Sequence, residues 1–258
     1  MHILFLSRWY PHPPDNGSKI RISNLLRGLA EKHQLSLISF FDPKQGVPDV
    51  SGLGHLCHQI QLVPYKEFEP GSRRARLGFL SLTPRSYLDT ASQEMRQFIR
   101  DAIAKGDIDV VIASQIDTAV YAAEFQNHPS IFEEVEIGVL HDQCFNAASS
   151  LARMRSSLTW WKHRRFLANL ASSFRACTVV SERERGMLAE IVHGETRLEV
   201  IPNSVNLAAY AEINEAPLPD SMIFTGSFTF KPNYEAMQLY RPPMKQVLES
   251  AQVARSKA

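Results

Sequence analysis

The chain begins with a short apolar segment, a stiff loop and an amphipathic helix, all within its first thirty residues. His2–Leu6 has no charged region ahead of it and is too short for a signal sequence, so it predicts a buried strand of a parallel sheet. The loop that follows contains three prolines and reaches Gly17. From Ser18 onward the apolar residues follow the spacing of one helix face, at Ile22, Leu25, Leu26 and Leu29.

The same alternation of strand and helix continues to about residue 201. Further strands are expected at residues 35–41, 59–63, 109–113, 136–140, 177–180 and 198–201. Helices are expected from Asp89 to about Gly106, from Thr118 to Phe125, over residues 150–175, and after Ser181, which forms a capping box with Glu184. This order predicts an α/β fold with a doubly wound parallel sheet, whose ligands bind beyond the carboxyl ends of the strands.

Composition excludes several classes of protein. The 44% hydrophobic and 21% charged residues are typical of a globular protein, and the net charge of +1 provides no global field for nucleic acid. Cys57, Cys144 and Cys177 form no paired motif, which argues against a zinc site or a disulfide framework and indicates reduced, cytoplasmic thiols. No apolar run approaches the roughly 18 residues that a membrane-spanning helix needs.

The entrance of the first helix is a candidate anion site. A glycine at this position admits a bulky anion to the backbone N–H groups of the first turn, and Lys19 and Arg21 add positive charge. Gly17, Lys19 and Arg21 are therefore expected to bind substrate. The alternative is an ordinary turn between strand and helix, and the dinucleotide fingerprint G-x-G-x-x-G is absent.

Three stretches in the same order resemble GT-B glycosyltransferases of family 4, most of all the sugar transferases of exopolysaccharide clusters. They are Arg8-Trp9-Tyr10-Pro11 with Gly17 and Lys19-Ile20-Arg21, then Val200-Ile201-Pro202-Asn203-Ser204-Val205-Asn206, and then Phe224-Thr225-Gly226-Ser227 with Lys231-Pro232-Asn233. The second differs from the family's I-P-N-G-V-D by a serine in place of the glycine. The resemblance implies that residues 1–206 are a Rossmann-like N-terminal domain on the acceptor side.

The resemblance also implies roles for individual residues. His141, which follows an apolar run and precedes Asp142, matches a histidine that contacts the sugar at the reacting centre in this family. His141 is therefore the expected catalytic residue, and Asp142 and Asn203 are expected to bind substrate. The alternatives are a histidine hydrogen-bonded at a strand end and an Asx turn at Asn203. After the preceding strand the family commonly has a histidine or an acid, where this chain offers Gln115 and Asp117, for which we predict no role.

A second domain is expected to begin and then stop early. Residues 207–220, with Pro217 and Pro219, are interpreted as a linker, and residues 221–258 as the truncated start of a donor-binding domain. Gly226 and Lys231 are the expected remnants of its donor side. Because Pro242 and Pro243 would break the helix expected from Tyr234 to Leu239, the tail is interpreted as frameshifted or truncated, and the chain as inactive alone.

The predicted function is transfer of a sugar from a nucleotide-sugar to a glycan or lipid-linked acceptor, with retention of configuration and without a metal or cofactor. Such transfer needs stabilisation of the departing diphosphate and a positioned acceptor hydroxyl. The alternative is a non-catalytic acceptor-binding or assembly module, which the absence of a donor motif favours. An oxidoreductase is disfavoured by the missing glycine fingerprint.

Two basic clusters that also contain large apolar residues predict peripheral contact with an anionic membrane, at the inner face of the plasma membrane. The candidate contact residues are Arg73, Arg74, Arg76, Trp160, Trp161, Arg164 and Arg165. The alternative is a solvated charged surface.

Overall fold

A computed structural model describes residues 1–138, 141, 150–192, 194–207, 223–224, 226 and 233–239. It divides the chain into two units, Met1–Asn206 and Leu207–Ala258. In the second unit residues 233–239 are helical, as expected for Tyr234 to Leu239, whereas Ile223, Phe224 and Gly226, the described residues between 222 and 226, are not part of a strand. The functional interpretation of residues 207–258 as linker and donor-side start stays a prediction.

The first unit contains a seven-stranded sheet in which every paired strand is parallel to its neighbour. In chain order the strands are β1 (His2–Ser7), β2 (Gln34–Phe41), β3 (Gln59–Pro64), β4 (Val110–Ser114), β5 (Ser130–Glu133), β6 (Ala176–Val179) and β7 (Arg197–Val200). Their order across the sheet is β3-β2-β1-β4-β5-β6-β7. The predicted fold, a doubly wound parallel α/β sheet of Rossmann type, is therefore confirmed.

Strand β1 lies between β2 and β4, where the direction of winding reverses. Phe5 is paired with Leu37 of β2 on one side and with Ile112 of β4 on the other. The segments that follow β1 and β4 therefore leave the sheet side by side, which opens a crevice at their carboxyl ends. The expected strand 59–63 forms the sheet edge as β3.

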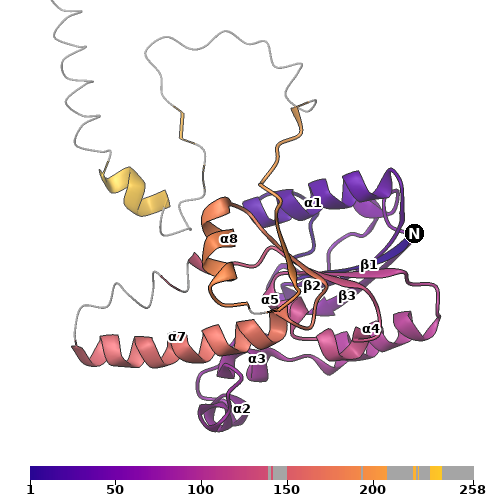
Figure 1. Ribbon diagram of the computed structural model, residues 1–258. Helices are drawn as coiled ribbons and strands as arrows, with labels where there is room; N and C mark the ends of the chain where they lie inside the picture. Colours follow the sequence, from indigo (N-terminus) through magenta and orange to yellow (C-terminus); the bar gives the residue numbers. More distant parts are fainter. Residues whose placement is uncertain are drawn as a thin grey trace, which may run out of the picture. The chain divides into compact units, whose positions relative to one another are not determined.

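Helices cover both faces of the sheet. The α-helices are α1 (Gly17–Ala30), α2 (Arg73–Leu77), α3 (Arg85–Thr90), α4 (Gln93–Ala104), α5 (Ile116–Ala119), α7 (Ser150–Ala171) and α8 (Glu182–Ala189). Short 3₁₀ turns are η1 (Pro43–Gln45), η2 (Ser51–Leu53), η3 (Gly78–Leu80) and η4 (Ala122–Phe125). Figure 1 shows α1 above the sheet, and α4 and α7 below it.

The alternation of side chains along β1 explains these two layers. Ile3 and Phe5 pack with Ile22 and Leu26 of α1 in one apolar cluster. Leu4 and Leu6 point to the opposite face, into a larger cluster that includes α4 and α7. Because side chains alternate across a strand, a continuous apolar run such as β1 must be covered on both faces.

Two sequence-based expectations about elements are wrong. The strand expected at 136–140 is instead β5 (Ser130–Glu133), because only this earlier segment pairs with β4 and β6. The helix expected from Asp89 is divided into α3 and α4, and Asp89 is buried at the end of α3. Its carboxylate accepts hydrogen bonds from Ser72 Oγ, from Glu69 N at 2.9 Å and from Lys66 Nζ at 3.0 Å, so it anchors residues 66–72 instead of capping a helix.

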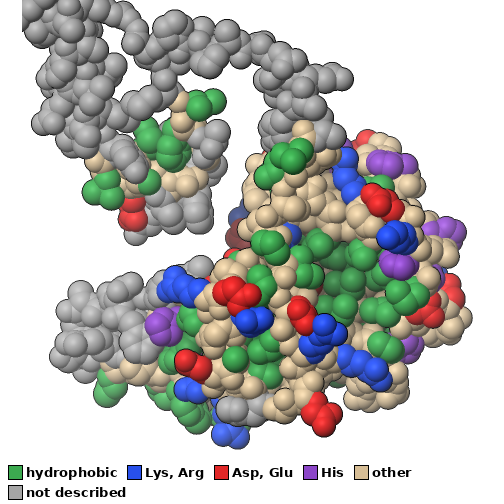
Figure 2. Space-filling model, turned by 45° about the horizontal axis from the view of Figure 1, so that its top comes forward, with side chains coloured by type: hydrophobic (Ala, Val, Ile, Leu, Met, Phe, Trp, Pro, Cys, Tyr) green, Lys and Arg blue, Asp and Glu red, His purple; other side chains and the backbone are tan. Residues whose placement is uncertain are grey.

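The described surface carries mixed charge. Lysine and arginine side chains are interspersed with aspartate and glutamate over the face that Figure 2 shows. Among the residues that the structure describes, no helix is long and apolar enough to cross a membrane.

Candidate functional site

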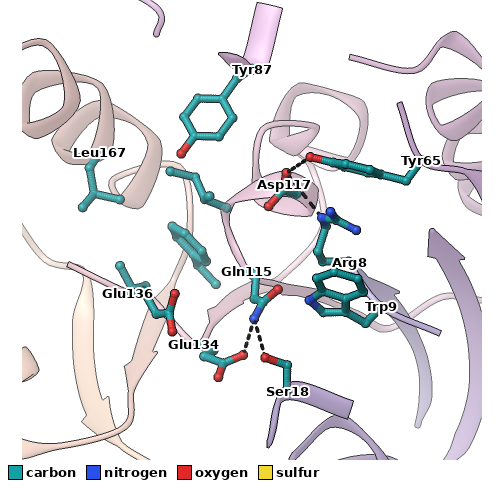
Figure 3. A pocket seen from close by; sticks show the side chains of 13 residues that line it. Arg8, Trp9, Ser18, Tyr65, Tyr87, Gln115, Asp117, Glu134, Glu136 and Leu167 are labelled. Atoms are coloured by element: carbon teal, nitrogen blue, oxygen red, sulfur yellow. Dashed lines mark hydrogen bonds and ion pairs between the residues drawn. The ribbon is translucent and has the colours of Figure 1, made fainter. Parts of the chain in front are cut away.

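A cavity of about 430 Å³ lies at the carboxyl ends of β1, β4 and β5, where the strand order reverses. Its lining comes from segments that are far apart in the sequence: Arg8, Trp9, Ser18, Tyr65, Tyr87, Gln115, Ile116, Asp117, Phe132, Glu134, Val135, Glu136 and Leu167. Figure 3 shows Gln115 near the centre, with the two glutamates on one side and Arg8 and Trp9 on the other. This crevice is where open α/β sheets bind ligands.

Gln115, the residue directly after β4, has an unusual backbone conformation. Its φ of 66° and ψ of 163° lie in a region that is essentially restricted to glycine. Its backbone N–H donates to the Glu133 carbonyl at 2.9 Å, and its side-chain Nε2 donates to Glu134 Oε2 at 2.9 Å. These two hydrogen bonds hold the side-chain amide in the cavity although the backbone of Gln115 is strained. Strained backbone conformations of this kind cluster at functional sites.

Glu134, directly after β5, is like Gln115 a non-glycine residue with a positive φ, at 56°. Its backbone N–H donates to Thr178 Oγ1 at 3.2 Å, which fixes the chain as it leaves the sheet. Burial, followed by the charge of Glu133, raises the pKa of Glu134 to about 7. The cavity therefore holds a carboxyl group that titrates near neutral pH, which is common at binding and catalytic sites.

A buried ion pair lies beneath these two residues. Arg21 Nε of α1 donates to Glu133 Oε1 at 2.7 Å, with side-chain exposures of 3% and 4%. Ser114 Oγ donates to the other oxygen, Glu133 Oε2, at 2.5 Å, and Arg21 Nη1 donates to Asn203 Oδ1 at 3.1 Å. Arg21 thus joins α1, β5 and the segment after β7, while its Nη2 is buried without a hydrogen-bond partner.

The opposite wall is built around Arg8. Its guanidinium carbon lies 3.2 Å from the centroid of the Tyr65 ring and 4.1 Å from that of Trp9. Its Nε lies 3.7 Å from Asp117 Oδ1, which also accepts a hydrogen bond from Tyr65 Oη at 3.3 Å. Burial raises the pKa of Asp117, and the charge of Arg8 opposes this shift. The positive charge of Arg8 is therefore already committed to aromatic rings and a carboxylate.

A second cavity of about 480 Å³ borders the first and shares Trp9 with it. Asp15, Asn16 and Lys19 from the entrance of α1 contribute to its lining. Asn16 Oδ1 accepts the Lys19 N–H at 3.0 Å, and Lys19 Nζ pairs with Asp15 at 3.0 Å. The helix entrance is thus already capped, and the nearby lysine is paired with an acid.

Gly17, Lys19 and Arg21, which were expected to form one anion site at the entrance of α1, lie in three different environments. Gly17 is exposed at the start of α1, and a Cβ there would meet nothing within 4 Å, so neither space nor conformation requires glycine. Lys19 lines the second cavity, whereas Arg21 is buried below the first. The charge of Arg21 is compensated by Glu133 below the first cavity, and substrate binding by Arg21 and Lys19 stays a prediction. Anion binding at Gly17 stays a prediction.

His141 does not follow a strand, because β5 ends at Glu133. It belongs to a helical segment, and its ring packs edge-on against Trp160 of α7 with centroids 5.4 Å apart. It is not part of the cavity lining, and its catalytic role stays untested. Asp142 and Lys231 lie outside the described residues, and Gly226 belongs to the second unit. Asn203 reaches the site through Arg21, without lining the cavity.

Sequence reasoning missed Glu134 and assigned no role to Gln115 and Asp117, although all three line the cavity. The adjacent acids Glu133 and Glu134 directly after the apolar pair Ile131 and Phe132 were an available signal, since acids at a strand end point to a ligand site. Placing that strand six residues too late concealed the signal. The positive φ angles of Gln115 and Glu134 could not be predicted from the sequence, because neither residue is a glycine.

The membrane-contact candidates lie on two adjoining elements. Arg73, Arg74 and Arg76 are exposed on α2, and Trp161, Arg164 and Arg165 are exposed on α7. Trp160 differs, because it is partly buried and packs against the core. Lys162 Nζ of α7 donates to the carbonyls of Phe79 and Ser81, in and directly after the turn η3 that follows α2, at 3.0 and 3.2 Å.

Within the described part of the chain, no group of three or more histidine, cysteine or acidic side chains is arranged to hold a metal ion. Cys57 and Cys177 are buried free thiols, and burial raises the pKa of each.

The sequence matches no protein-family model. No curated protein matches it either.

Several solved structures are similar to the chain at low sequence identity, among them the following three. Sucrose-phosphate synthase from Thermosynechococcus elongatus is 16% identical, with a TM-score of 0.49 over 84% of this chain and 53% of that protein. Phytolacca americana UGT2, complexed with UDP-2fluoro-glucose and pterostilbene, is 8% identical, with a TM-score of 0.45 over 79% and 53%. A Listeria monocytogenes protein named as a putative UDP-N-acetylglucosamine 2-epimerase is 8% identical, with a TM-score of 0.39 over 74% of this chain and 42% of that protein.

The chain thus spans about half the length of the first two structures. At these identities and TM-scores, we assign no family, substrate or residue role from the similarity.

Proposed function

We propose that this chain is the acceptor-side part of a GT-B glycosyltransferase that moves a sugar from a nucleotide-sugar to a hydroxyl group of a glycan or lipid-linked acceptor. The observation that carries the proposal is the cavity at the switch point, where the strained Gln115 and Glu134 present an amide and a carboxyl group to a ligand. Both groups suit hydroxyl recognition, because a sugar hydroxyl donates and accepts hydrogen bonds. The resemblance of the first loop and of Val200–Asn206 to family 4 gives the reaction type.

In the proposed reaction, the bond between the anomeric carbon and the diphosphate oxygen breaks, and a bond to the acceptor oxygen forms. The acceptor hydroxyl transfers its proton to the departing diphosphate, which takes the electron pair of the broken bond and the negative charge. Gln115 and Glu134 position that hydroxyl and form no covalent bond. We expect the anomeric configuration to be retained, as the resemblance implies, and NMR of the product would show it.

Sugar binding to the cavity is the first test. Saturation-transfer NMR on the 258-residue chain with a panel of methyl glycosides should detect binding, and Ser18→Trp should abolish it by filling the cavity from the first turn of α1. Ser157→Trp, at an exposed position of α7 outside the cavity lining, is the matched control and should bind normally. Absence of binding, or equal binding to both variants, would overturn the proposal.

A non-catalytic acceptor-binding module is the second candidate, favoured by the fact that the whole cavity lining belongs to Met1–Asn206. The two functions differ in turnover. Release of nucleoside diphosphate from UDP-glucose, UDP-N-acetylglucosamine or GDP-mannose that depends on a bound acceptor supports a transferase. Because this chain is expected to be inactive alone, the same assay is repeated with a version extended by a complete donor-binding domain, and acceptor binding without release by both proteins supports the module.

For the acceptor's location we propose an anionic membrane. A basic apolar surface, made of Arg73, Arg74, Arg76, Leu77, Phe79, Leu80 and Leu82, is formed by α2, η3 and the residues after them. Leu77, Phe79, Leu80 and Leu82 are 70%, 61%, 93% and 55% exposed, and residues 71–88 contain four arginines and no acid. Exposed apolar side chains flanked by arginines suit a bilayer with anionic headgroups.

The cavity and this surface share their supporting helices. Tyr87 of α3 and Leu167 of α7 line the cavity, while α3 directly follows the basic apolar surface and α7 is bonded to it through Lys162. A lipid-linked acceptor could therefore remain in the membrane while its sugar enters the cavity.

Sedimentation with vesicles tests the membrane proposal. Vesicles containing phosphatidylglycerol should retain the protein at low salt and release it at high salt, whereas pure phosphatidylcholine should retain little. Leu80→Asp and the pair Arg73→Glu with Arg74→Glu should each weaken retention. The pair Arg27→Glu with Lys32→Glu, on and after α1 at the other face of the sheet, changes charge equally and should not. Equal retention of all variants would contradict the proposal.

A further inference from the structure

The charges that line the cavity are unbalanced. Asp117, Glu134 and Glu136 supply three carboxyl groups, and Arg8 supplies the one guanidinium among the lining residues. Arg8 lies between Tyr65 and Trp9 and next to Asp117. Its positive charge is therefore directed at these three side chains, and not at a ligand in the cavity. A ligand in this cavity consequently meets a negative potential on the Glu134 side.

Below the cavity, the remaining nearby cation is also neutralised. Arg21 is nine-tenths buried, and its Nε lies 2.7 Å from Glu133 and 3.9 Å from Glu134. Arg21 is closer to Glu133 than to Glu134, and Ser114 donates a hydrogen bond to the second oxygen of Glu133. The charge of Glu133 is therefore well compensated, whereas that of Glu134 is not.

On the Glu134 side of the cavity, the hydrogen-bonding groups are similarly one-sided, because they mainly accept hydrogen bonds. Glu134 offers carboxylate oxygens, which accept, and Gln115 uses its amide N–H₂ group toward Glu134, with Ser18 Oγ 3.5 Å away. The rim residue Glu136 also offers acceptors. A hydroxyl or an ammonium group can donate to all of these, whereas a carboxylate or phosphate cannot.

We propose that the cavity selects a neutral or amino sugar as the acceptor and rejects sugars that carry a carboxylate or phosphate, with Glu134 as the residue that discriminates. This rests on the proposed function and specifies its substrate class. Glu134 acts through charge and through acceptance of hydrogen bonds from the sugar, while Gln115 holds its carboxyl group in place. The Glu133 carbonyl, which accepts the Gln115 N–H, and the Thr178 hydroxyl, which accepts the Glu134 N–H, set the position of both residues.

The discrimination depends on pH. The groups that face Glu134 are Glu133 and Glu136 on its own segment and Arg21 on α1, and the two glutamates favour its protonated form. Since its pKa is about 7, Glu134 gains its negative charge as the pH rises from 6 to 8. Rejection of an anionic sugar should therefore strengthen over this interval.

Binding of three matched probes tests the proposal on the 258-residue chain: the methyl glycosides of glucose, glucosamine and glucuronic acid. At pH 7 the glucuronide should bind about tenfold more weakly than the glucoside, and the glucosaminide at least as tightly as the glucoside. Between pH 6 and 8 the affinity for the glucuronide, which is charged throughout, should fall severalfold.

Glu134→Gln preserves shape and removes the charge, so it should bind the glucuronide severalfold more tightly than the wild type and without the fall between pH 6 and 8. Glu136→Gln at the more exposed rim is a second cavity variant that should relieve part of the rejection. Glu31→Gln, an exposed position after α1, changes net charge equally outside the cavity and should leave the preference intact.

The outcomes separate the two proposals. Equal affinity for glucoside and glucuronide, with binding still blocked by Ser18→Trp, overturns the charge selection and leaves the proposed function standing. Binding of none of the three probes overturns both. A pH-dependent rejection that Glu134→Gln leaves unchanged assigns the discrimination to another residue and overturns the role of Glu134.

Discussion

At the residue scale, the site is defined by two adjacent strand ends that adopt left-handed backbone conformations. Gln115 and Glu134 are held together by one hydrogen bond and by backbone contacts to β5 and β6. Left-handed conformations of non-glycine residues cost free energy and persist only when the surroundings fix them. Their pairing at the switch point is the strongest structural indication of a binding site in this chain.

The backbone conformation of Gln115 predicts a difference between two substitutions. Gln115→Gly and Gln115→Ala both remove the amide, but only glycine is relaxed at φ 66° and ψ 163°. We expect the glycine variant to have a free energy of unfolding about 1 kcal/mol higher than the alanine variant. Urea denaturation of the two proteins would measure it, and equal stability would mean that the backbone is not strained.

The raised pKa of Glu134 predicts a pH-dependent stability. Because its folded-state pKa of about 7 lies above the ordinary 4.5, its contribution to stability is present below pH 4.5 and is lost as the pH rises through 7. Glu134→Gln should therefore become more stable relative to the wild type by up to about 3 kcal/mol between pH 4.5 and 8.

Denaturation at several pH values would give this difference directly, since the other titrating groups contribute equally to both proteins. Glu31→Gln serves as the surface control. A difference between Glu134→Gln and the wild type that stays constant over this pH range would contradict the assignment.

At the element scale, α8 supports the segment that leaves β5. Ser181 Oγ accepts the Glu184 N–H at 3.3 Å, as the capping-box prediction requires. The Glu184 carboxylate, however, accepts from the Ile137 and Gly138 N–H groups at 3.0 and 3.1 Å. A helix-capping residue thus anchors the loop that carries Glu134 and Glu136.

Glu184→Ala should consequently destabilise the protein by about 2–3 kcal/mol, because two backbone donors lose a charged acceptor. Hydrogen exchange at the Ile137 and Gly138 amides should accelerate, and sugar binding should weaken. Glu182→Ala, in the first turn of the same helix, removes a surface pair with Arg185 and should cost less than about 1 kcal/mol. Equal effects of the two substitutions would show that the loop does not depend on Glu184.

At the scale of the whole molecule, both apolar clusters lie within the first unit, Met1–Asn206. The segment after β7 is also held by that unit, through Arg21 to Asn203 and through Asn24 Nδ2 to the Ser204 carbonyl at 2.9 Å. Since a domain with its own core can fold alone, this unit should not require the residues that follow it.

A protein that ends at Asn206 should therefore unfold cooperatively, with the same denaturation midpoint as the 258-residue chain and the same affinity for a methyl glycoside. Urea denaturation and NMR titration of the two proteins would compare them. Loss of cooperative unfolding in the shorter protein would show that residues 207–258 contribute to its core.

Local pattern in the sequence was sufficient to predict the doubly wound parallel sheet, because apolar runs and helical spacing report which residues each element buries. His2–Leu6, the helix with Ile22 and Leu26, and the strands near 110 and 177 all follow this rule. The rule failed for β5, where Ser130–Glu133 is too short to show a period and ends in two acids.

The content of the candidate site was decided by tertiary structure. Arg21 and Glu133 are separated by 112 residues, and no local spacing indicates that they pair. Arg8, Gln115 and Glu134 meet because β1 is placed between β2 and β4, next to the point where the winding reverses. The left-handed conformations of Gln115 and Glu134 likewise depend on hydrogen bonds to neighbouring strands. Periodicity in the sequence determines which residues face the core, whereas the strand order and these long-range contacts determine which residues face one another.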